Sequence, residues 1–203
     1  MFYRVIWLLA FLLCNLLFRL QVRGREHLPR QGPFLLVANH SSYLDPIVIA
    51  VSLWRPINFL GHDGLFRIPV LRTILPWLHT MPVRRGEGDV GAIRRSLHIL
   101  RRGEPLLIFP EGTRSPDGRL RPARPGAAAL ALRTGVPVVP VGVVGAGRVL
   151  PVGGPFRLAK IQVRFGPALD LKTSAAEPST ATLQMMAAIS QLLPSELRSL
   201  LDP

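Results

Sequence analysis

Two short stretches of the sequence combine the residue types and the spacing of a reaction site. The first, residues 39–46, reads Asn-His-Ser-Ser-Tyr-Leu-Asp-Pro and places the imidazole of His40 five residues before the carboxylate of Asp45. An imidazole held by a carboxylate is a common general base near neutral pH. We therefore expect His40 to remove a proton from a substrate and Asp45 to orient the ring, although an isolated pair of this kind more often only stabilises a loop.

The second stretch, residues 109–115, reads Phe-Pro-Glu-Gly-Thr-Arg-Ser. It supplies the carboxylate of Glu111, a backbone turn at Gly112 and Thr113, and the guanidinium of Arg114, which are groups suited to a polar or phosphorylated substrate. Each stretch follows an apolar run that is typical of a buried strand. Ligands bind at the carboxyl ends of strands in open α/β sheets, so this position favours a binding role for residues 109–115.

Strand-like and helix-like patterns alternate along the chain around these stretches. Short apolar runs predict strands at 20–22, 34–38, 57–60, 81–84, 105–109, 137–144 and 161–165. Apolar residues at helical spacing predict helices at 46–53, 65–78 (broken by its prolines), 89–102, 126–134, 180–193 and 195–201. This alternation predicts an α/β layered single domain with a mainly parallel central sheet flanked by helices.

Three local patterns refine this prediction. Asp45 before a proline is typical of a helix start with Asp as the N-cap. Residues 115–125 are the most loop-like stretch, and we expect them to form a mobile flap over the site. Gly145-Ala146-Gly147 begins like a dinucleotide-binding motif, but Leu150 occupies the position of its third glycine and no helix is predicted there, so we interpret it as a tight turn.

The N-terminus contains an apolar segment that is too short for an ordinary membrane span. Its core, Val5 to Phe18, has 14 residues, whereas a spanning helix usually needs ~20. The alternatives for this segment are a helix that dips into one leaflet, a short tilted span and a buried core helix. Aromatic residues at one end and arginines at both ends favour the interfacial helix. We expect residues 1–20 to form an uncleaved membrane-associating helix and residues 21–203 to form the domain that carries the motifs.

The composition is strongly basic and rather apolar. The chain has 25 Lys and Arg against 12 Asp and Glu, a net charge of +13, and 48% hydrophobic residues. Such a surface suits nucleic acid, anionic lipid or an acidic carrier. The arginines are dispersed and do not alternate with aromatic residues as in single-strand-binding proteins, so lipid is favoured and a basic nucleic-acid-binding protein is the alternative from another class. The single cysteine cannot form an internal disulfide, which is compatible with the cytoplasm.

The motifs and their order resemble those of the glycerolipid acyltransferases, specifically the 1-acylglycerol-3-phosphate (lysophosphatidate) acyltransferase group. Residues 39–45 match the first block of this family, an Asn-His followed by Asp, and residues 109–115 match the third block without a change. Val-Pro-Val-Val-Pro at 136–140 matches the fourth block. The second block is looser, because residues 79–85 read His-Thr-Met-Pro-Val-Arg-Arg, with His79 where the family usually has Gly. The first and third blocks at a spacing of about 70 residues are highly specific together.

This resemblance implies the transfer of an acyl group to the free hydroxyl of 1-acylglycerol-3-phosphate, giving phosphatidic acid for phospholipid biosynthesis. The implied donor is acyl-CoA or acyl carrier protein, and no bound cofactor, no metal and no covalent enzyme intermediate is expected, because a thioester is already activated. The resemblance implies that His40 is the general base, that Asp45 orients it, and that the acceptor is bound by Arg85, or its neighbour Arg84, together with Glu111, Gly112, Thr113 and Arg114.

The looser second block leaves the identity of the acceptor open. Another lyso-lipid, such as a lysophospholipid or a lyso-aminolipid, is the alternative acceptor. The implied partners are a lyso-lipid acceptor, an acyl thioester donor and an anionic membrane surface. Acyl carrier protein is a further partner if it carries the acyl group, and nucleic acid is not expected as a partner. The implied location is the cytoplasmic face of the inner membrane of a bacterium.

Overall fold

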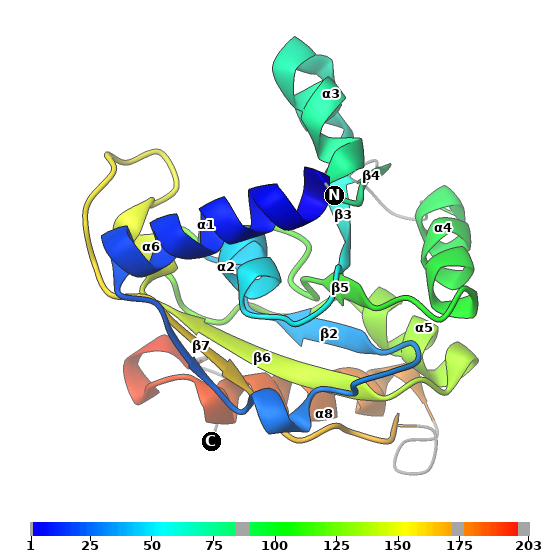
Figure 1. Ribbon diagram of the computed structural model, residues 1–203. Coiled ribbons are helices and arrows are strands. Elements are labelled where there is room, and N and C mark those ends of the chain that lie inside the picture. Colours follow the sequence, from blue (N-terminus) through cyan, green and yellow to red (C-terminus); the bar gives the residue numbers. More distant parts are fainter. Residues whose placement is uncertain (1, 84–89, 172–176, 199–203) are drawn as a thin grey trace.

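The computed structural model describes residues 2–83, 90–171 and 177–198 (Figure 1). Its centre is a seven-stranded sheet among these residues, in the order β1-β7-β6-β2-β5-β3-β4. The strands are β1 (Gln21–Arg23), β2 (Leu35–Ala38), β3 (Asn58–His62), β4 (Thr80–Val83), β5 (Leu106–Ile108), β6 (Val138–Val144) and β7 (Gln162–Phe165). The strands from β6 to β4 pair in parallel, whereas β7 runs antiparallel to β6. The predicted α/β domain with a mainly parallel sheet is therefore confirmed.

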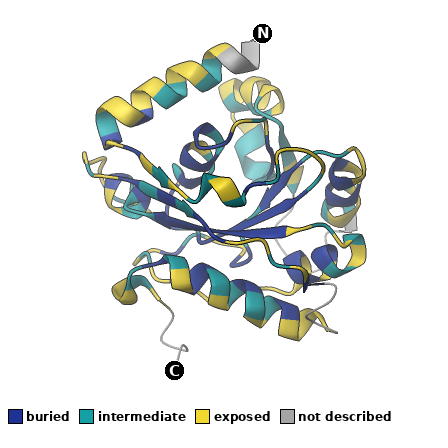
Figure 2. Cartoon of the chain, turned by 60° about the horizontal axis from the view of Figure 1, so that its bottom comes forward, coloured by how far each residue is buried: buried dark blue, intermediate teal, exposed yellow. Residues whose placement is uncertain are grey.

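Helices cover both faces of this sheet. The helices in the described part of the chain are α1 (Phe2–Phe18), α2 (Asp45–Val51), α3 (Pro69–Trp77), α4 (Val90–Arg101), α5 (Gly126–Thr134), α6 (Ala146–Val149) and α8 (Pro178–Leu192), with 3-10 turns η1 (Arg25–His27), η2 (Asp63–Arg67) and η3 (Ser195–Leu197). In Figure 1, α1 and α2 lie on one face, and α5 and α8 lie on the other. Figure 2 shows the buried strands between these layers. Burial on both faces explains why the residues of β2 are all apolar.

Three of the predicted elements differ in detail from the structure. The short helix predicted at 195–201 is only the 3-10 turn η3 in its described part, because Arg198 is extended. The segment 65–78 is divided into η2 and α3, because Ile68 is extended and Pro69 starts a new helix. The prediction of a tight turn after β6 is wrong in one respect, because the one-turn helix α6 begins there. Gly145 adopts a left-handed conformation with φ 93°, and its carbonyl accepts a hydrogen bond from the N–H of Arg148 at 3.0 Å.

Helix α1 contributes one face to the core of the domain and leaves the other face exposed. Cys14 and Phe18 are buried, and the indole N–H of Trp7 donates a hydrogen bond of 3.1 Å to the carbonyl of Ala50 in α2. The exposed side of α1 carries Val5, Leu8, Leu9, Leu12, Leu13 and Leu16. No helix of the described residues has both the length and the apolar character of a membrane span. Helix α1 therefore has a buried face, as expected of a core helix, and an exposed apolar face, as expected of an interfacial helix.

Candidate active site

The loop between β2 and α2 brings His40 and Asp45 together. Helix α2 begins at Asp45 itself with Leu44 as its N-cap, so the prediction that Asp45 is the N-cap is wrong. The reason is that its carboxylate turns back to the loop. Oδ2 of Asp45 accepts hydrogen bonds from the backbone N–H groups of Ser41 at 2.6 Å and Ser42 at 2.7 Å. These two bonds hold the loop in a tight curve around the carboxylate.

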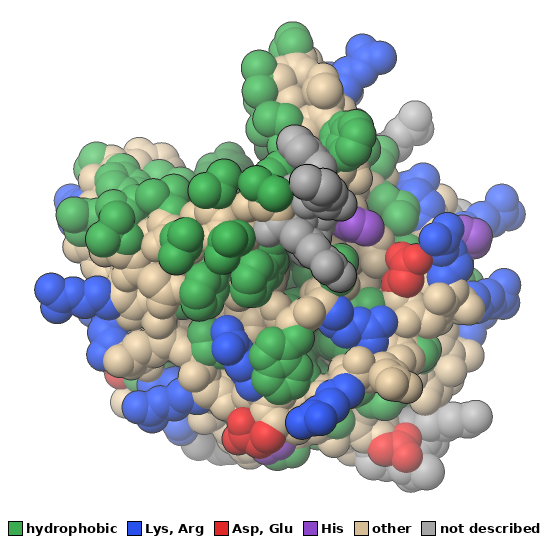
Figure 3. Space-filling model, in the orientation of Figure 1, with side chains coloured by type: hydrophobic (Ala, Val, Ile, Leu, Met, Phe, Trp, Pro, Cys, Tyr) green, Lys and Arg blue, Asp and Glu red, His purple; other side chains and the backbone are tan. Residues whose placement is uncertain are grey.

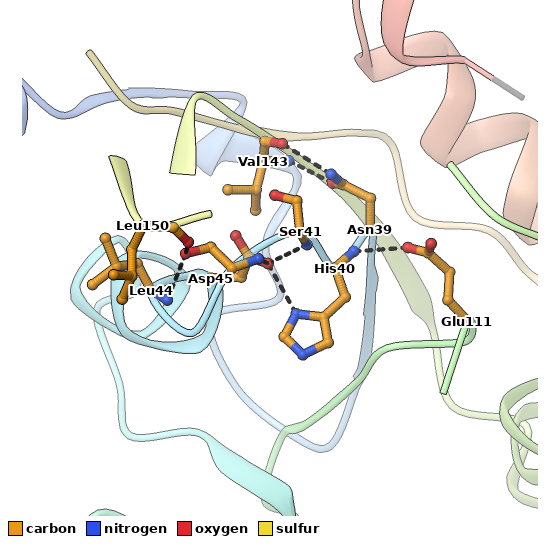
Figure 4. A network of polar contacts seen from close by, with 9 residues as sticks. Asn39, His40, Ser41, Leu44, Asp45, Glu111, Val143 and Leu150 are labelled. Carbon is orange, nitrogen blue, oxygen red and sulfur yellow. Dashed lines mark hydrogen bonds and ion pairs between the residues drawn. The ribbon is translucent and has the colours of Figure 1, made fainter. Parts of the chain in front are cut away.

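The same carboxylate oxygen contacts the imidazole ring. Nδ1 of His40 lies 2.9 Å from Oδ2 of Asp45, which is completely buried (Figure 4). An ionised carboxylate only accepts hydrogen bonds, so Nδ1 carries the hydrogen and Nε2 keeps a lone pair. No described residue forms a hydrogen bond with Nε2, and the ring is partly exposed. This arrangement leaves one ring nitrogen able to accept a proton from a bound molecule.

The second motif is attached to His40 by three contacts. The backbone N–H of His40 donates to Oε1 of Glu111 at 2.7 Å, and the backbone N–H of Ser115 donates to the carbonyl of His40 at 2.7 Å. The ring of Phe109 stacks on the imidazole with 3.9 Å between the centroids. Residues 39–46 and 109–115 therefore form one unit, although about 70 residues separate them in the sequence.

Glu111 is a buried carboxyl group that joins two loops. Its Oε1 accepts from His40, and its Oε2 accepts from the backbone N–H of Arg121 at 3.0 Å, within the loop 115–125. Burial raises the pKa of Glu111 from 4.5 to about 7, although the two backbone hydrogen bonds oppose this shift. Each oxygen accepts one backbone hydrogen bond, so Glu111 links the loop after β2 to the loop 115–125.

The guanidinium carbon Cζ of Arg114 lies over the exposed ring of Tyr43, 3.4 Å from the ring centroid. This geometry is a cation–π contact between the two motifs. Nη1 of Arg114 is buried and has no hydrogen-bond partner among the described residues. A guanidinium held in this way has an unused N–H group for an anionic ligand.

Of the other predicted binding residues, the structure describes Gly112 and Thr113 but not the two arginines of the second block. Thr113 and Gly112 are exposed. Gly112 has φ +69°, and a Cβ there would lie 3.3 Å from Cδ of Arg124, so glycine suits this turn. Arg84 and Arg85 lie outside the described residues.

Asn39 is a structural residue of the site whose contacts the sequence did not reveal. Its side chain donates to the carbonyl of Val143 at 2.9 Å and accepts from the N–H of Val143 at 2.7 Å. The pair ties the end of β2 to β6 (Figure 4). In addition, the hydroxyl of Ser42 donates to the carbonyl of Leu150 at 2.9 Å. A polar residue directly after a buried strand was the only sequence signal for this role.

Comparison with known proteins assigns the family. Residues 19–144 match the family model described as Acyltransferase. The chain belongs to the acyltransferase family. This assignment confirms the resemblance in the motifs and favours it over the nucleic-acid-binding alternative.

Several relatives of this acyltransferase-family chain are enzymes of lipid synthesis by name. It is 37% identical over 139 residues to a chloroplastic 1-acyl-sn-glycerol-3-phosphate acyltransferase of Brassica napus, with 67% of this chain and 40% of that protein covered. It is 39% identical to a lyso-ornithine lipid O-acyltransferase of Pseudomonas aeruginosa, with 68% of this chain and 52% of that protein covered. The chain thus spans about half or less of the length of these relatives.

A solved structure shows the same fold. The crystal structure of the 1-acyl-sn-glycerophosphate (LPA) acyltransferase PlsC from Thermotoga maritima superposes with a TM-score of 0.80 at 26% sequence identity. The match covers 94% of this chain and 78% of that chain. The superposition therefore covers nearly the whole length of this chain.

Proposed function

We propose that this protein transfers an acyl group from acyl-CoA or acyl carrier protein to the free hydroxyl of 1-acylglycerol-3-phosphate, giving phosphatidic acid. The observation that supports this most is the contact of 2.9 Å between Nδ1 of His40 and Oδ2 of Asp45, which leaves Nε2 as an acceptor. The names of the relatives support the choice of substrate.

In this proposal His40 is the general base. Nε2 takes the proton of the acceptor hydroxyl while the hydroxyl oxygen attacks the carbonyl carbon of the thioester. A C–O bond forms, the C–S bond breaks, and the departing thiolate takes the proton from the imidazolium. Asp45 stabilises the imidazolium between these two steps.

The phosphate of the acceptor is bound by Arg114 in this proposal. The cation–π contact with Tyr43 positions the guanidinium, and its buried Nη1 has no hydrogen-bond partner in the described part of the chain. A planar guanidinium can bind a phosphate through two parallel hydrogen bonds. Arg85, or Arg84, is proposed as a second phosphate ligand from the family resemblance. Glu111 acts by positioning the backbone of His40, since both of its oxygens accept backbone hydrogen bonds.

The exposed apolar face of α1 is proposed to lie in the cytoplasmic leaflet of a bacterial inner membrane. Amphipathic helices of this kind insert their apolar side into the headgroup–acyl boundary, and a net charge of +13 favours anionic lipid. A membrane position brings the enzyme to a lipid acceptor, while the thioester donor arrives from the aqueous side.

A second candidate acceptor is a lyso-aminolipid without a phosphate, because the chain is 39% identical to a lyso-ornithine lipid O-acyltransferase. The two candidates are tested by giving the purified protein one acyl thioester and three separate acceptors: 1-acylglycerol-3-phosphate, a lysophospholipid and lyso-ornithine lipid. We expect the highest kcat/KM with 1-acylglycerol-3-phosphate. A higher kcat/KM with lyso-ornithine lipid would replace our proposal with the second candidate, and no transfer to any of the three would reject both.

A further inference from the structure

Helix α3 is an exposed arm at the edge of the domain. It follows β3 and η2 and returns to the edge strand β4. None of its residues is buried. In Figure 1, α3 rises above the rest of the domain, on the side of the sheet that carries α1. A helix without buried residues gains little stability from the core, so its sequence reflects another requirement.

The apolar residues of α3 form two neighbouring stripes. Leu71, Leu75 and the C-cap residue Leu78 recur at helical spacing and are half-buried. Val70, Ile74 and Trp77 recur at the same spacing and are 66%, 39% and 60% exposed. A helix on the surface of a globular protein usually has one apolar stripe, which faces the core. The second stripe of α3 therefore faces water unless another apolar phase covers it.

We infer that α3 is a second membrane-inserting element, which lies in the boundary between headgroups and acyl chains of an anionic bilayer. This inference rests on the proposed lipid acceptor. Three observations favour a bilayer as the occupant. The apolar side chains of α3 and of α1 gather on the same upper side of the molecule in Figure 3. Trp77 is exposed in the stripe, and tryptophan prefers the membrane interface. The neighbouring Arg67 and Arg72 are exposed cations, which attract anionic headgroups, although Arg67 also pairs with Asp63 at 3.6 Å.

Insertion at two places would determine how the site faces the membrane. Helix α1 contacts α2 through the hydrogen bond between Trp7 and Ala50, and α2 begins at Asp45. A bilayer that meets both α1 and α3 therefore lies beside the helix that carries Asp45. With one inserted helix the domain could rotate about the axis of that helix, whereas a second insertion point restricts this rotation.

The test compares the full-length protein with the double variant Val70→Ser/Ile74→Ser in co-sedimentation with vesicles of phosphatidylcholine and phosphatidylglycerol. We expect the partition coefficient of the double variant to fall about tenfold, because apolar carbons are removed from both inserted side chains. The matched control is Leu183→Ser on α8, on the opposite face of the sheet, where the leucine is 71% exposed. We expect this control to bind like the wild type.

Equal vesicle binding by the wild type and the double variant would overturn the inference. If the double variant unfolds, Val70→Asp replaces it, since this position is exposed, and the same loss of binding is expected. Acyl transfer to a detergent-dispersed acceptor is measured in parallel for the wild type. Absence of this transfer would reject the proposed function, whereas the vesicle result alone decides the role of α3.

Discussion

The imidazole of His40 lies against the ring of Phe109, with the two planes 16° apart and the centroids separated by 3.9 Å. Asp45 holds the edge of the same imidazole at Nδ1. One face and one edge of the ring are therefore fixed by residues from two distant motifs. Nε2 is the part of the ring that these contacts leave to a substrate.

Replacement of Phe109 by leucine is expected to lower kcat about tenfold and to change KM little, because a loosened base spends less time in the reactive geometry. Phe109→Tyr keeps the aromatic ring and should retain most of the activity. Steady-state kinetics of both variants are compared with the wild type. A wild-type kcat for Phe109→Leu would show that the stack does not position His40.

Glu111 is expected to make the stability of the protein depend on pH. Its pKa is 4.5 when the chain is unfolded and about 7 in the fold, so the folded state favours the protonated form. The stabilisation is complete below pH 4.5 and is lost as the pH rises through 7, by about 3 kcal/mol in total. Glutamine cannot titrate, so the free energy of unfolding of Glu111→Gln should change less over this range.

The measurement is denaturant unfolding of both proteins from pH 4.5 to pH 8. Glu26→Gln is the control, because Glu26 is an exposed carboxylate on the surface turn η1. We expect the control to follow the wild-type curve. Parallel curves for the wild type and Glu111→Gln would contradict the raised pKa of Glu111.

Arg114→Lys is expected to weaken the use of 1-acylglycerol-3-phosphate selectively. A charge-assisted hydrogen bond contributes about 1.5–3 kcal/mol, so the loss of one contact should lower kcat/KM about ten- to a hundredfold. With a lyso-lipid that has no terminal phosphate, the same variant should show a much smaller decrease in kcat/KM. An equal loss with both acceptors would mean that Arg114 does not bind the phosphate.

The sequence predicted most of the fold and the local part of the site. The contact between His40 and Asp45 could be anticipated because five residues separate them on one loop. The roles of Asn39 and Glu111 could not, because their partners Val143 and His40 lie 104 and 71 residues away. The sequence pattern also did not predict that Asp45 lies inside α2. Its carboxylate accepts hydrogen bonds from the preceding loop, whereas an N-cap side chain accepts them from the first turn of its helix.

The apolar face of α1 is expected to bind membranes without supporting the fold. Leu9 and Leu16 are exposed, so Leu9→Ser/Leu16→Ser should lower vesicle binding about tenfold and leave the melting temperature unchanged. Substitution is preferable to truncation, because removal of α1 would also remove the buried Cys14 and Phe18. Unchanged vesicle binding by this variant would place the membrane contact elsewhere.

The role of His40 as the general base is tested most directly by the rate of acyl transfer from an acyl thioester to 1-acylglycerol-3-phosphate in His40→Ala. We expect a turnover lower by about 10²–10⁴-fold with an unchanged melting temperature. His98→Ala, which alters an exposed histidine of α4, should keep the wild-type rate. A folded His40→Ala protein that transfers the acyl group at nearly the wild-type rate would show that His40 is not the general base.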